Sequence, residues 1–243
     1  MRYFLVILCG IIVASNACEK ASDPSRITSA GGSVTEIIYL LKAENNLIAV
    51  DVTSNYPLEA KKLPSIGYVR QLSAEGLLSL DPTIIIGEDD MGPPSVLDQI
   101  KRTQVEITII PEEHNVEGIL NKIECISSVI GIDSEAIINS TVIPKITKLN
   151  QLTQDSKKQK IIYILGMQSG SPLVAGNNTS GDGLIKISGG VNPFSTFEGW
   201  KPVGTESIIE ASPDLIIISE RGLKGFGTME DLRMHPALYL TPA

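Results

Sequence analysis

The chain has 243 residues and a formal net charge of −8 at neutral pH. An acidic surface of this kind does not favour nucleic acid or anionic lipid as a partner, and the sequence contains no basic run that argues otherwise. A chain of this length can bury two modest cores, so a division into two lobes is natural.

The first eighteen residues predict an export signal. A charged start precedes an apolar run at residues 3–14, which is far shorter than the roughly 20 residues of a membrane span. The run ends in Ser15-Asn16-Ala17-Cys18, which resembles a bacterial lipobox and makes Cys18 a candidate for lipid attachment. Ser15 is a poor residue at the first lipobox position, so ordinary cleavage after Ala17 stays open. A lipid on Cys18 would make residues 19–25 a tether.

Removal of the signal leaves one cysteine. Cys9 and Cys18 both fall within the export segment, so Cys125 has no partner and we expect no internal disulfide. Cys125 lies on the apolar face of a predicted helix, where packing is a more common role than reactivity. The core must then supply the stability of the exported chain.

Short apolar strands alternate with helical patterns over residues 26–115, which is typical of an α/β lobe. A strand at 26–29 leads through Gly31-Gly32 to a helix at 33–41, where Ser33 and Glu36 have the spacing of a capping box. The other predicted strands are 47–50, 83–86 and 107–110, and the other predicted helices are 74–79 and 94–101.

Residues 116–155 lack strand-like runs and follow helical spacing, with Gly131 and Pro144 as irregular points. We interpret them as one long connecting helix or two abutting ones. A second lobe at 156–243 opens with a strand at 160–165. It continues with a helix at about 180–188 and a strand at 215–218.

An internal echo relates the two lobes. Residues 75–86 align with residues 206–217, and each segment has an acid, apolar helical residues, a proline and a buried strand. Many helix-to-strand units share this pattern, but here the acid and the proline stand in the same register. Two matching lobes favour a cleft between them as the ligand site.

Gly67-Tyr68-Val69-Arg70 belongs to a set of stretches that resemble one known family. That family is the haem-specific branch of the periplasmic solute-binding proteins that serve cobalamin, siderophore and haem importers. The similarity runs from about Arg26 to the C-terminus, and the haem assignment depends mostly on the Gly-Tyr-x-Arg segment. The matching stretches are 51–57, 65–76, 91–94, 175–179 and 189–192.

The resemblance implies an α/β fold of two Rossmann-like lobes joined by a long connecting helix, which is the class III periplasmic binding protein fold. It also implies a periplasmic location. Relatives continue beyond the equivalent of Leu240-Thr241-Pro242-Ala243 with another strand and closing helices, so the chain looks C-terminally truncated. On this comparison the second lobe lacks part of the cover of its sheet.

Tyr68 is the expected ligand of the haem iron. A phenolate is a hard donor suited to ferric iron, although free tyrosine titrates near about pH 10 and needs help at neutral pH. Arg70 lies on the same side of the chain if the segment is extended. There its guanidinium either favours the phenolate or pairs with a haem propionate. The resemblance points to the same two residues, and the alternative is a surface tyrosine beside a turn.

The second axial ligand is less defined. The loop expected at 166–170 has no histidine, where some relatives have one, and Met167 is the candidate in it. Sulfur prefers softer iron, so five-coordinate iron, or iron completed by water, is the default and Met167 packs. Gly31-Gly32-Ser33 offers backbone N–H groups to a propionate. Three aromatic residues either line the cleft or pin a long loop: Phe194, Phe197 and Trp200.

Glu75 and Glu206 stand near equivalent helix starts in the two lobes. The resemblance implies that paired acids at these positions dock on arginines of the permease dimer of an ABC transporter, whose ATPase subunits supply the energy for release. Each acid alone is also explained by the dipole of its helix.

Enzyme functions find little support in the sequence. Its only histidines, His114 and His235, lie neither beside a nucleophile motif nor in metal-ligand spacing. We therefore expect a non-enzymatic protein that carries haem, with a ferric siderophore or cobalamin as the alternative cargo. A lipid-anchored redox or sensor subunit on the same fold is the alternative from another class.

Overall fold

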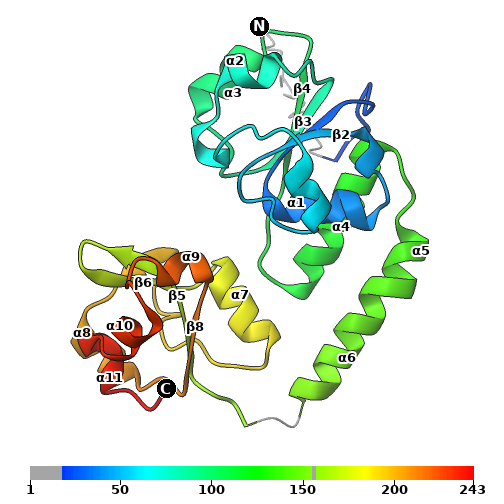
Figure 1. The fold of residues 1–243 in the computed structure, drawn as a ribbon. Coiled ribbons are helices and arrows are strands. Elements are labelled where there is room, and N and C mark those ends of the chain that lie inside the picture. Colours follow the sequence, from blue (N-terminus) through cyan, green and yellow to red (C-terminus); the bar gives the residue numbers. More distant parts are fainter. Residues whose placement is uncertain (1–17, 155–156) are drawn as a thin grey trace, which may run out of the picture. The chain divides into compact units, whose positions relative to one another are not determined.

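The computed structural model describes residues 18–154 and 157–243, and the export signal predicted at the N-terminus lies outside this part except for Cys18. The described chain forms two compact units. Unit 1 contains the residues up to Pro111 together with Cys125–Ile132, and unit 2 contains Glu112–Glu124 together with Asp133–Ala243. Both units combine a sheet with helices, which confirms the predicted α/β class (Figure 1).

Unit 1 is built on a parallel sheet in the strand order β2-β1-β3-β4. Ile84, Ile85 and Ile86 of the central strand β3 are fully buried, as expected for a parallel strand with helices on both faces. Each strand lies within two residues of its predicted range, because such strands are short continuous apolar runs. The strands are β1 (Ile27–Ala30), β2 (Leu47–Val50), β3 (Ile84–Glu88) and β4 (Glu106–Ile110).

Helices cover both faces of this sheet. Helices α2 and α3 pack against Ala30, Ala49 and Ile85. Helix α1 covers the other face, where its Thr35 hydroxyl donates to the Ser29 hydroxyl at 2.8 Å, and α4 lies beside α1 (Figure 1). The bounds are α1 (Gly32–Leu40), α2 (Ala74–Leu78), α3 (Pro94–Ile100), α4 (Val116–Ile130) and the short 3-10 helices η1 (Glu44–Asn46), η2 (Leu58–Lys62) and η3 (Val69–Gln71).

The N-terminus of α1 differs from the prediction. Gly31 precedes the helix and no side chain caps it, so the predicted capping box of Ser33 and Glu36 is not formed. The Ser33 hydroxyl instead donates to the Glu88 carboxylate at the end of β3. Capping-box spacing in the sequence cannot reveal this competing acceptor, because Glu88 is distant along the chain.

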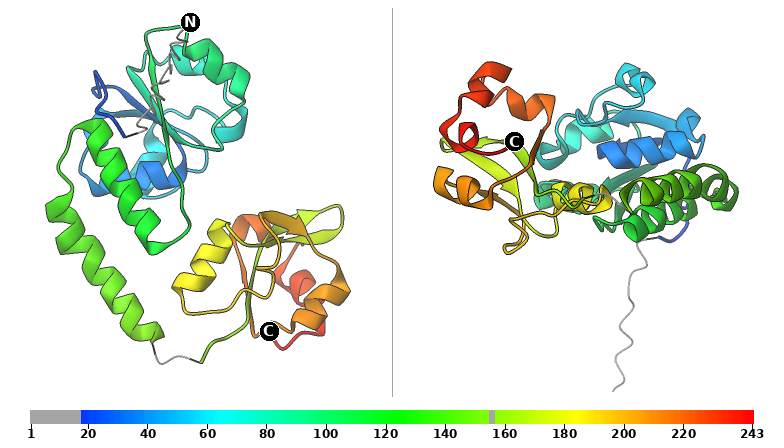
Figure 2. Two further views of the ribbon diagram at one scale, coloured as in Figure 1. Left: turned by 180° about the vertical axis from the view of Figure 1, so that it is seen from behind. Right: turned by 90° about the horizontal axis from the view of Figure 1, so that it is seen from below.

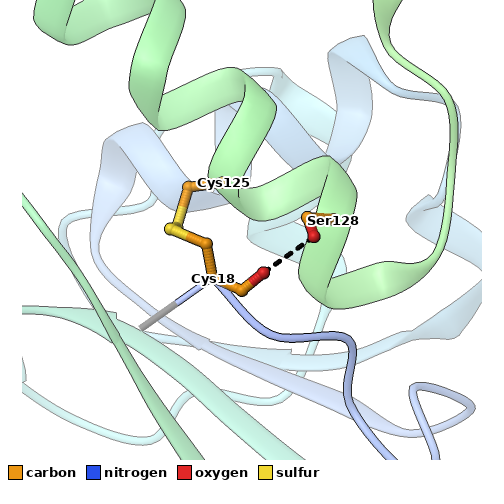
Figure 3. The surroundings of a disulfide bond; sticks show 3 residues. All are labelled: Cys18, Cys125 and Ser128. Carbon is orange, nitrogen blue, oxygen red and sulfur yellow. Dashed lines mark hydrogen bonds between the residues drawn. A yellow bond between two sulfur atoms is a disulfide. The ribbon is translucent and has the colours of Figure 1, made fainter. Parts of the chain in front are cut away.

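A disulfide joins Cys18 to Cys125 on α4 (Figure 3). The two Cα atoms lie 4.8 Å apart, across 107 residues of sequence. The predictions of an unpaired Cys125 and of no internal disulfide are therefore wrong, because they assigned Cys18 to the removed signal. Lipid attachment at Cys18 stays a prediction, and a lipid would occupy the sulfur that forms this bond.

The segment at 116–153 forms two helical stretches. Helix α4 ends before Gly131, which adopts a φ of +74°, and the second stretch runs from Glu135 to Thr153. Pro144 does not break it and closely follows a π-helical turn at Ile138–Val142, the kind of irregularity that accommodates a residue without an N–H. None of the helices within 18–154 and 157–243 is long and apolar enough to span a membrane. The second stretch comprises α5 (Glu135–Ile137), the π-helical turn η4 (Ile138–Val142) and α6 (Ile143–Thr153).

Unit 2 contains a mixed sheet in the order β7-β6-β5-β8. Strand β8 is parallel to β5, whereas β6 and β7 are antiparallel to their neighbours, so this lobe departs from a purely parallel Rossmann-like sheet. The sequence predicts β5 and β8 but not β6 and β7, which are short and contain Pro172 and Pro202. The strands are β5 (Ile161–Gln168), β6 (Ser171–Ala175), β7 (Trp200–Pro202) and β8 (Leu215–Ile218).

Two layers of helices enclose the sheet of unit 2 (Figure 2). Helix α7 lies on the face that carries Ile161 and Tyr163. The opposite face carries Ile162 and Ile164, which form a core with side chains of α8, α10 and α11. The helices are α7 (Ser180–Ile187), α8 (Thr205–Ala211), α9 (Glu220–Leu223), α10 (Met229–Arg233) and α11 (Pro236–Tyr239).

Candidate functional site

The segment around Tyr68 lies at the carboxyl end of β2. The Val50 N–H donates to the Pro64 carbonyl at 3.0 Å, and the Ile66 N–H donates to the Val50 carbonyl at 2.9 Å. The Val52 N–H then donates to the Gly67 carbonyl at 2.9 Å. These three bonds fix one side of the segment at the edge where open α/β sheets bind their ligands.

The loop after β3 fixes the other side of the same segment. The Gly92 N–H donates to the Val69 carbonyl at 2.9 Å, and the Leu72 N–H donates to the Gly92 carbonyl at 2.8 Å. Two of the stretches that resemble the haem-binding branch, 65–76 and 91–94, are therefore hydrogen-bonded to each other. Tyr68 itself is half-buried and packs against the core of unit 1.

Gly67 determines how the chain reaches Tyr68. Its φ of +85° lies in the region that disfavours a side chain, although open space surrounds the position of a Cβ. Tyr68 is extended and directly precedes the short helix η3, which contains Arg70. The segment is therefore not extended through Arg70, so the condition under which the two residues would lie on the same side of an extended chain is not met.

Arg70 is held by a carboxylate that the sequence analysis did not single out. Its Nε and Nη2 atoms both lie 2.8 Å from Oδ2 of Asp90. The hydrogen bond to Asp90 raises the pKa of the Arg70 guanidinium above its ordinary value, and the nearby Tyr68 and Asp89 act in the same direction. The guanidinium is thus charged and positioned before any ligand arrives. Asp90 precedes the Met-Gly-Pro-Pro stretch, but only the fold brings it to Arg70.

Asp51 organises the loop that follows β2. Its Oδ1 accepts hydrogen bonds from the Gly31 N–H at 3.2 Å and the Ser54 hydroxyl at 2.8 Å, and its Oδ2 accepts one from the Thr53 N–H at 2.9 Å. Asp51 is buried, so its role is to hold the loop that contains the exposed residues Val52 and Tyr56.

The predicted propionate site at Gly31-Gly32-Ser33 is already filled by a side chain of the protein. The carboxylate of Glu88 accepts a hydrogen bond from Ser33 and lies against Gly31. A second carboxylate at this helix N-terminus would meet the negative charge of the first. The structure therefore does not support the sequence-based prediction that this segment receives a propionate.

Met167 lies in a hairpin and not in an open loop. Strand β5 runs through Gln168, and Met167 pairs with Pro172 of β6. Ser169 and Gly170 form the turn between the strands, with φ values of 50° and 79°. Met167 is half-buried and contacts the chain at Gly225.

The stretches at 175–179 and 189–192 hold unit 2 together. The Asn192 side-chain N–H donates to the Ala175 carbonyl at 3.0 Å and to Oδ1 of Asp182 at 2.9 Å. Lys186 pairs with the buried Asp182 at 2.6 Å, and Thr179 caps α7. These motif residues therefore have a structural role within unit 2.

The three aromatic residues also serve packing. Phe194 is buried and lies 6.0 Å from Phe197, measured between ring centroids. Phe197 covers Gly176, where any Cβ would lie within 2.4 Å of its ring. Trp200 makes an edge contact with Tyr163 at 5.7 Å. These contacts support the interpretation in which the aromatic residues pin a long connection.

A polar pocket of about 380 Å³ lies in unit 2. All its lining residues carry polar or charged side chains, which does not suit a large flat apolar ligand. No group of three or more His, Cys, Asp or Glu within residues 18–154 and 157–243 is arranged to hold a metal ion. The pocket is lined by His114, Asn115, Asn177, Asn178, Asp182, Lys186 and Glu198.

Glu75 and Glu206 occupy equivalent places in the two units. Both are exposed in the first turn of a helix, Glu75 in α2 and Glu206 in α8. The likeness extends further along the chain, because Asp81 and Ser212 both adopt a left-handed conformation, with φ values of 51° and 48°. Each immediately precedes the proline before a parallel strand. This shared irregularity supports the predicted internal echo.

Residues 27–243 match the model of a protein family described as periplasmic binding protein. Among curated relatives, an uncharacterized ABC transporter substrate-binding lipoprotein of Bacillus subtilis, YvrC, is 21% identical over 82% of this chain and 64% of its own. The chain thus spans less than two thirds of the length of that relative. The vitamin B12-binding protein of Vibrio parahaemolyticus is 26% identical over 87% of this chain and 77% of its own.

Solved structures give a more specific likeness. The periplasmic haem-binding protein HutB of Vibrio cholerae is 35% identical, with a TM-score of 0.78 over 91% of this chain and 86% of its own. The apo form of the periplasmic haem-binding protein RhuT from Roseiflexus sp. RS-1 is 33% identical, with a TM-score of 0.84 over 90% of this chain and 85% of its own. Both likenesses cover the two units.

Proposed function

The chain belongs to the periplasmic binding protein family, and we propose that it captures haem in the periplasm and delivers it to an ABC importer. One observation carries the proposal. Tyr68 lies at the carboxyl edge of a parallel sheet beside Arg70 and Asp90, in a chain 33–35% identical to the haem-binding proteins HutB and RhuT.

Tyr68 is the iron ligand in this proposal. Ferric iron favours an anionic oxygen donor, and tyrosinate ligation of haem is known chemistry. The charge of Arg70 stabilises a phenolate nearby, and Asp90 prevents the guanidinium from turning away. The contact with Asp90 involves Nε and Nη2 of Arg70, and a guanidinium has five N–H donors, so a role beside the phenolate and a role beside a propionate are both compatible with this contact.

The surroundings of Tyr68 suit an apolar ring system. Val52 and Tyr56 are 52% and 66% exposed. The N–H of Val52 donates a hydrogen bond to the carbonyl of Gly67, the residue before Tyr68. Val52 and Tyr56 both belong to the loop that follows β2. We propose that they contact the porphyrin, and that Met167 contributes packing in place of a second ligand, which leaves the iron five-coordinate or completed by water.

Glu75 and Glu206 are the proposed docking residues for the permease. Each lies exposed at the start of a helix of its own unit, so a two-fold permease can meet one acid from each unit. The role of the chain is binding without a chemical step, and ATP is hydrolysed by the transporter's ATPase subunits.

Cobalamin is the second candidate cargo. The 26% identity to a vitamin B12-binding protein favours it. A cobalamin site needs no tyrosinate, so the effect of removing the Tyr68 hydroxyl distinguishes the two ligands. Ferric siderophores are the third cargo to test.

The test is a visible absorption titration of the mature chain with ferric haem. The variant Tyr68→Phe removes the phenol oxygen and keeps the packing, and Tyr163→Phe is a matched control because Tyr163 packs on Trp200 in unit 2. We expect a saturable Soret shift with phenolate-to-iron charge-transfer bands in the wild type and in Tyr163→Phe. These bands should vanish in Tyr68→Phe.

Spectra of free haem for all three proteins would overturn the haem proposal. A saturable titration with cobalamin by all three would then support the second candidate. If haem binds equally well to Tyr68→Phe, with unchanged bands, the assignment of the ligand is wrong.

A further inference from the structure

We propose that Cys18 leaves the export pathway as a thiol and is oxidised with Cys125. The disulfide then joins the mature N-terminus to α4, and Cys18 carries no lipid. The inference depends on the proposed export of the chain and not on its cargo. It assigns to Cys18 a modification that excludes the one suggested by its lipobox-like context.

The first argument is the bond itself. The sulfur of Cys18 is joined to the sulfur of Cys125, whereas a bacterial lipoprotein carries its diacylglyceryl group on that same sulfur. One sulfur atom holds one of these substituents at a time. Disulfides persist in oxidising compartments, which agrees with the periplasmic location.

The second argument is the docking of the residues that follow Cys18. The Ser128 hydroxyl donates to the carbonyl of Cys18 at 2.7 Å (Figure 3). The N–H of Ala21 donates to the carbonyl of Val129 at 2.9 Å, and Ala21 is only 3% exposed. These contacts attach the chain to α4 within one helical turn of Cys125.

The N-terminal segment at 18–25 also makes hydrogen bonds with the sheet of unit 1 and the turn before β2. The Ser22 N–H and hydroxyl both donate to Oε2 of Glu106 at 3.0 Å, and the Asn46 side-chain amide donates to the carbonyl of Pro24 at 3.1 Å. The segment at 18–25 is therefore bound along its length and does not form the predicted tether. A lipid on Cys18 would hold α4 and this face of unit 1 directly against the membrane.

Formation of the disulfide requires an external acceptor of electrons. The S–H bonds of Cys18 and Cys125 break and one S–S bond forms, with release of two protons and two electrons. A protein disulfide of the periplasmic oxidation system accepts both and becomes a dithiol. Ordinary cleavage after Ala17, which the poor lipobox allows, leaves the thiol of Cys18 unmodified.

Intact-mass analysis of the exported full chain tests this inference. The chain is produced with its own leader, and the periplasmic and membrane fractions are analysed without reductant. We expect periplasmic protein that begins at Cys18, is two hydrogen atoms lighter than the dithiol, and yields a disulfide-linked peptide pair containing Cys18 and Cys125. Maleimide should label neither residue before reduction.

Two variants complete the design. Cys125→Ser should leave Cys18 as a free thiol that takes one maleimide, and Cys9→Ser should behave as the wild type. A diacylglyceryl group on Cys18 in any of these proteins, or recovery of the wild type as a dithiol, overturns the inference. The mass of the protein is read without haem, so a failed haem titration leaves this result intact, and a lipid on Cys18 leaves the titration intact.

Discussion

Asp90 positions the guanidinium of the candidate site. It accepts both contacts from Arg70 at 2.8 Å. Asp89, its neighbour in sequence, interacts with Arg70 only through charge. A comparison of variants at Asp90 and at Asp89 therefore distinguishes the effect of the hydrogen bond that positions Arg70 from the effect of nearby negative charge.

Asp90→Asn should weaken haem binding, because the amide removes the charge that fixes Arg70; a charge-assisted hydrogen bond contributes about 1.5–3 kcal/mol. A visible absorption titration with ferric haem measures the affinity of each variant. Asp89→Asn should weaken binding much less, and equal losses in the two variants would contradict a positioning role for Asp90.

The sequence predicts Tyr68 and Arg70 because they lie two positions apart in one recognisable segment. It does not predict Asp90, because the contact depends on the loop after β3 meeting the segment after β2. The same holds for Glu88, which takes the place expected for a ligand carboxylate at the start of α1. Partners that are distant in sequence become visible only in the fold.

At the level of elements, the helix-to-strand unit of each lobe contains one residue in an unfavourable backbone conformation. Asp81 and Ser212 adopt left-handed conformations although neither is glycine, and such a conformation costs a non-glycine residue about 1–2 kcal/mol. Both positions join a helix to a strand through a proline. The turn geometry is thus retained in both units despite its strain.

Ser212→Gly should raise the free energy of unfolding of unit 2 by up to about 1 kcal/mol. Glycine adopts the φ of 48° without the steric penalty of a side chain, although its greater freedom in the unfolded chain offsets part of the gain. Urea denaturation followed by the fluorescence of Trp200, the single tryptophan, measures the change.

The matched control is the same substitution inside the preceding helix. Ser207→Gly places glycine in the exposed interior of α8, where it should lower the free energy of unfolding by roughly 0.5–1 kcal/mol. Effects of the same sign for the two variants would show that the conformation of Ser212 is not strained.

Whether an element can be predicted depends on how clearly its own sequence pattern indicates it. Continuous apolar runs reveal the buried strands β2, β3 and β8, and these lie at or near their predicted positions. Strands β6 and β7 escape prediction because both are short and contain a proline; the turn at Ser169-Gly170 joins β6 to its partner β5, whereas β7 reaches β6 through the long connection at 176–199. Local pattern identifies an element only where burial dictates its composition.

At the scale of the whole molecule, the division into two units predicts that they unfold separately, in which case no single free energy of unfolding describes the protein. The disulfide lies entirely within unit 1, since Cys18 and the segment from Cys125 to Ile132 both belong to it. Trp200 lies in unit 2. Its fluorescence therefore reports on unit 2, whereas far-ultraviolet circular dichroism reports on both units.

The sequence misled us about this bond for a physical reason. Cys18 follows an apolar run in a context that fits lipid attachment, and its partner lies 107 residues away. Only the return of α4 to the sheet of unit 1 brings the two sulfurs together. Cysteine spacing cannot reveal such a pair, because connectivity is not encoded locally.

Cys125→Ala should lower the free energy of unfolding of unit 1 by about 2–5 kcal/mol, because the bond closes a long loop and restricts the unfolded chain. Cys18→Ala removes the same bond and should have the same effect. The double variant should add little, since both changes break one interaction. In urea we expect part of the circular dichroism transition to move to lower concentration, while the Trp200 fluorescence transition stays in place. A parallel shift of both signals would mean that the two units unfold together and that the disulfide stabilises the whole molecule.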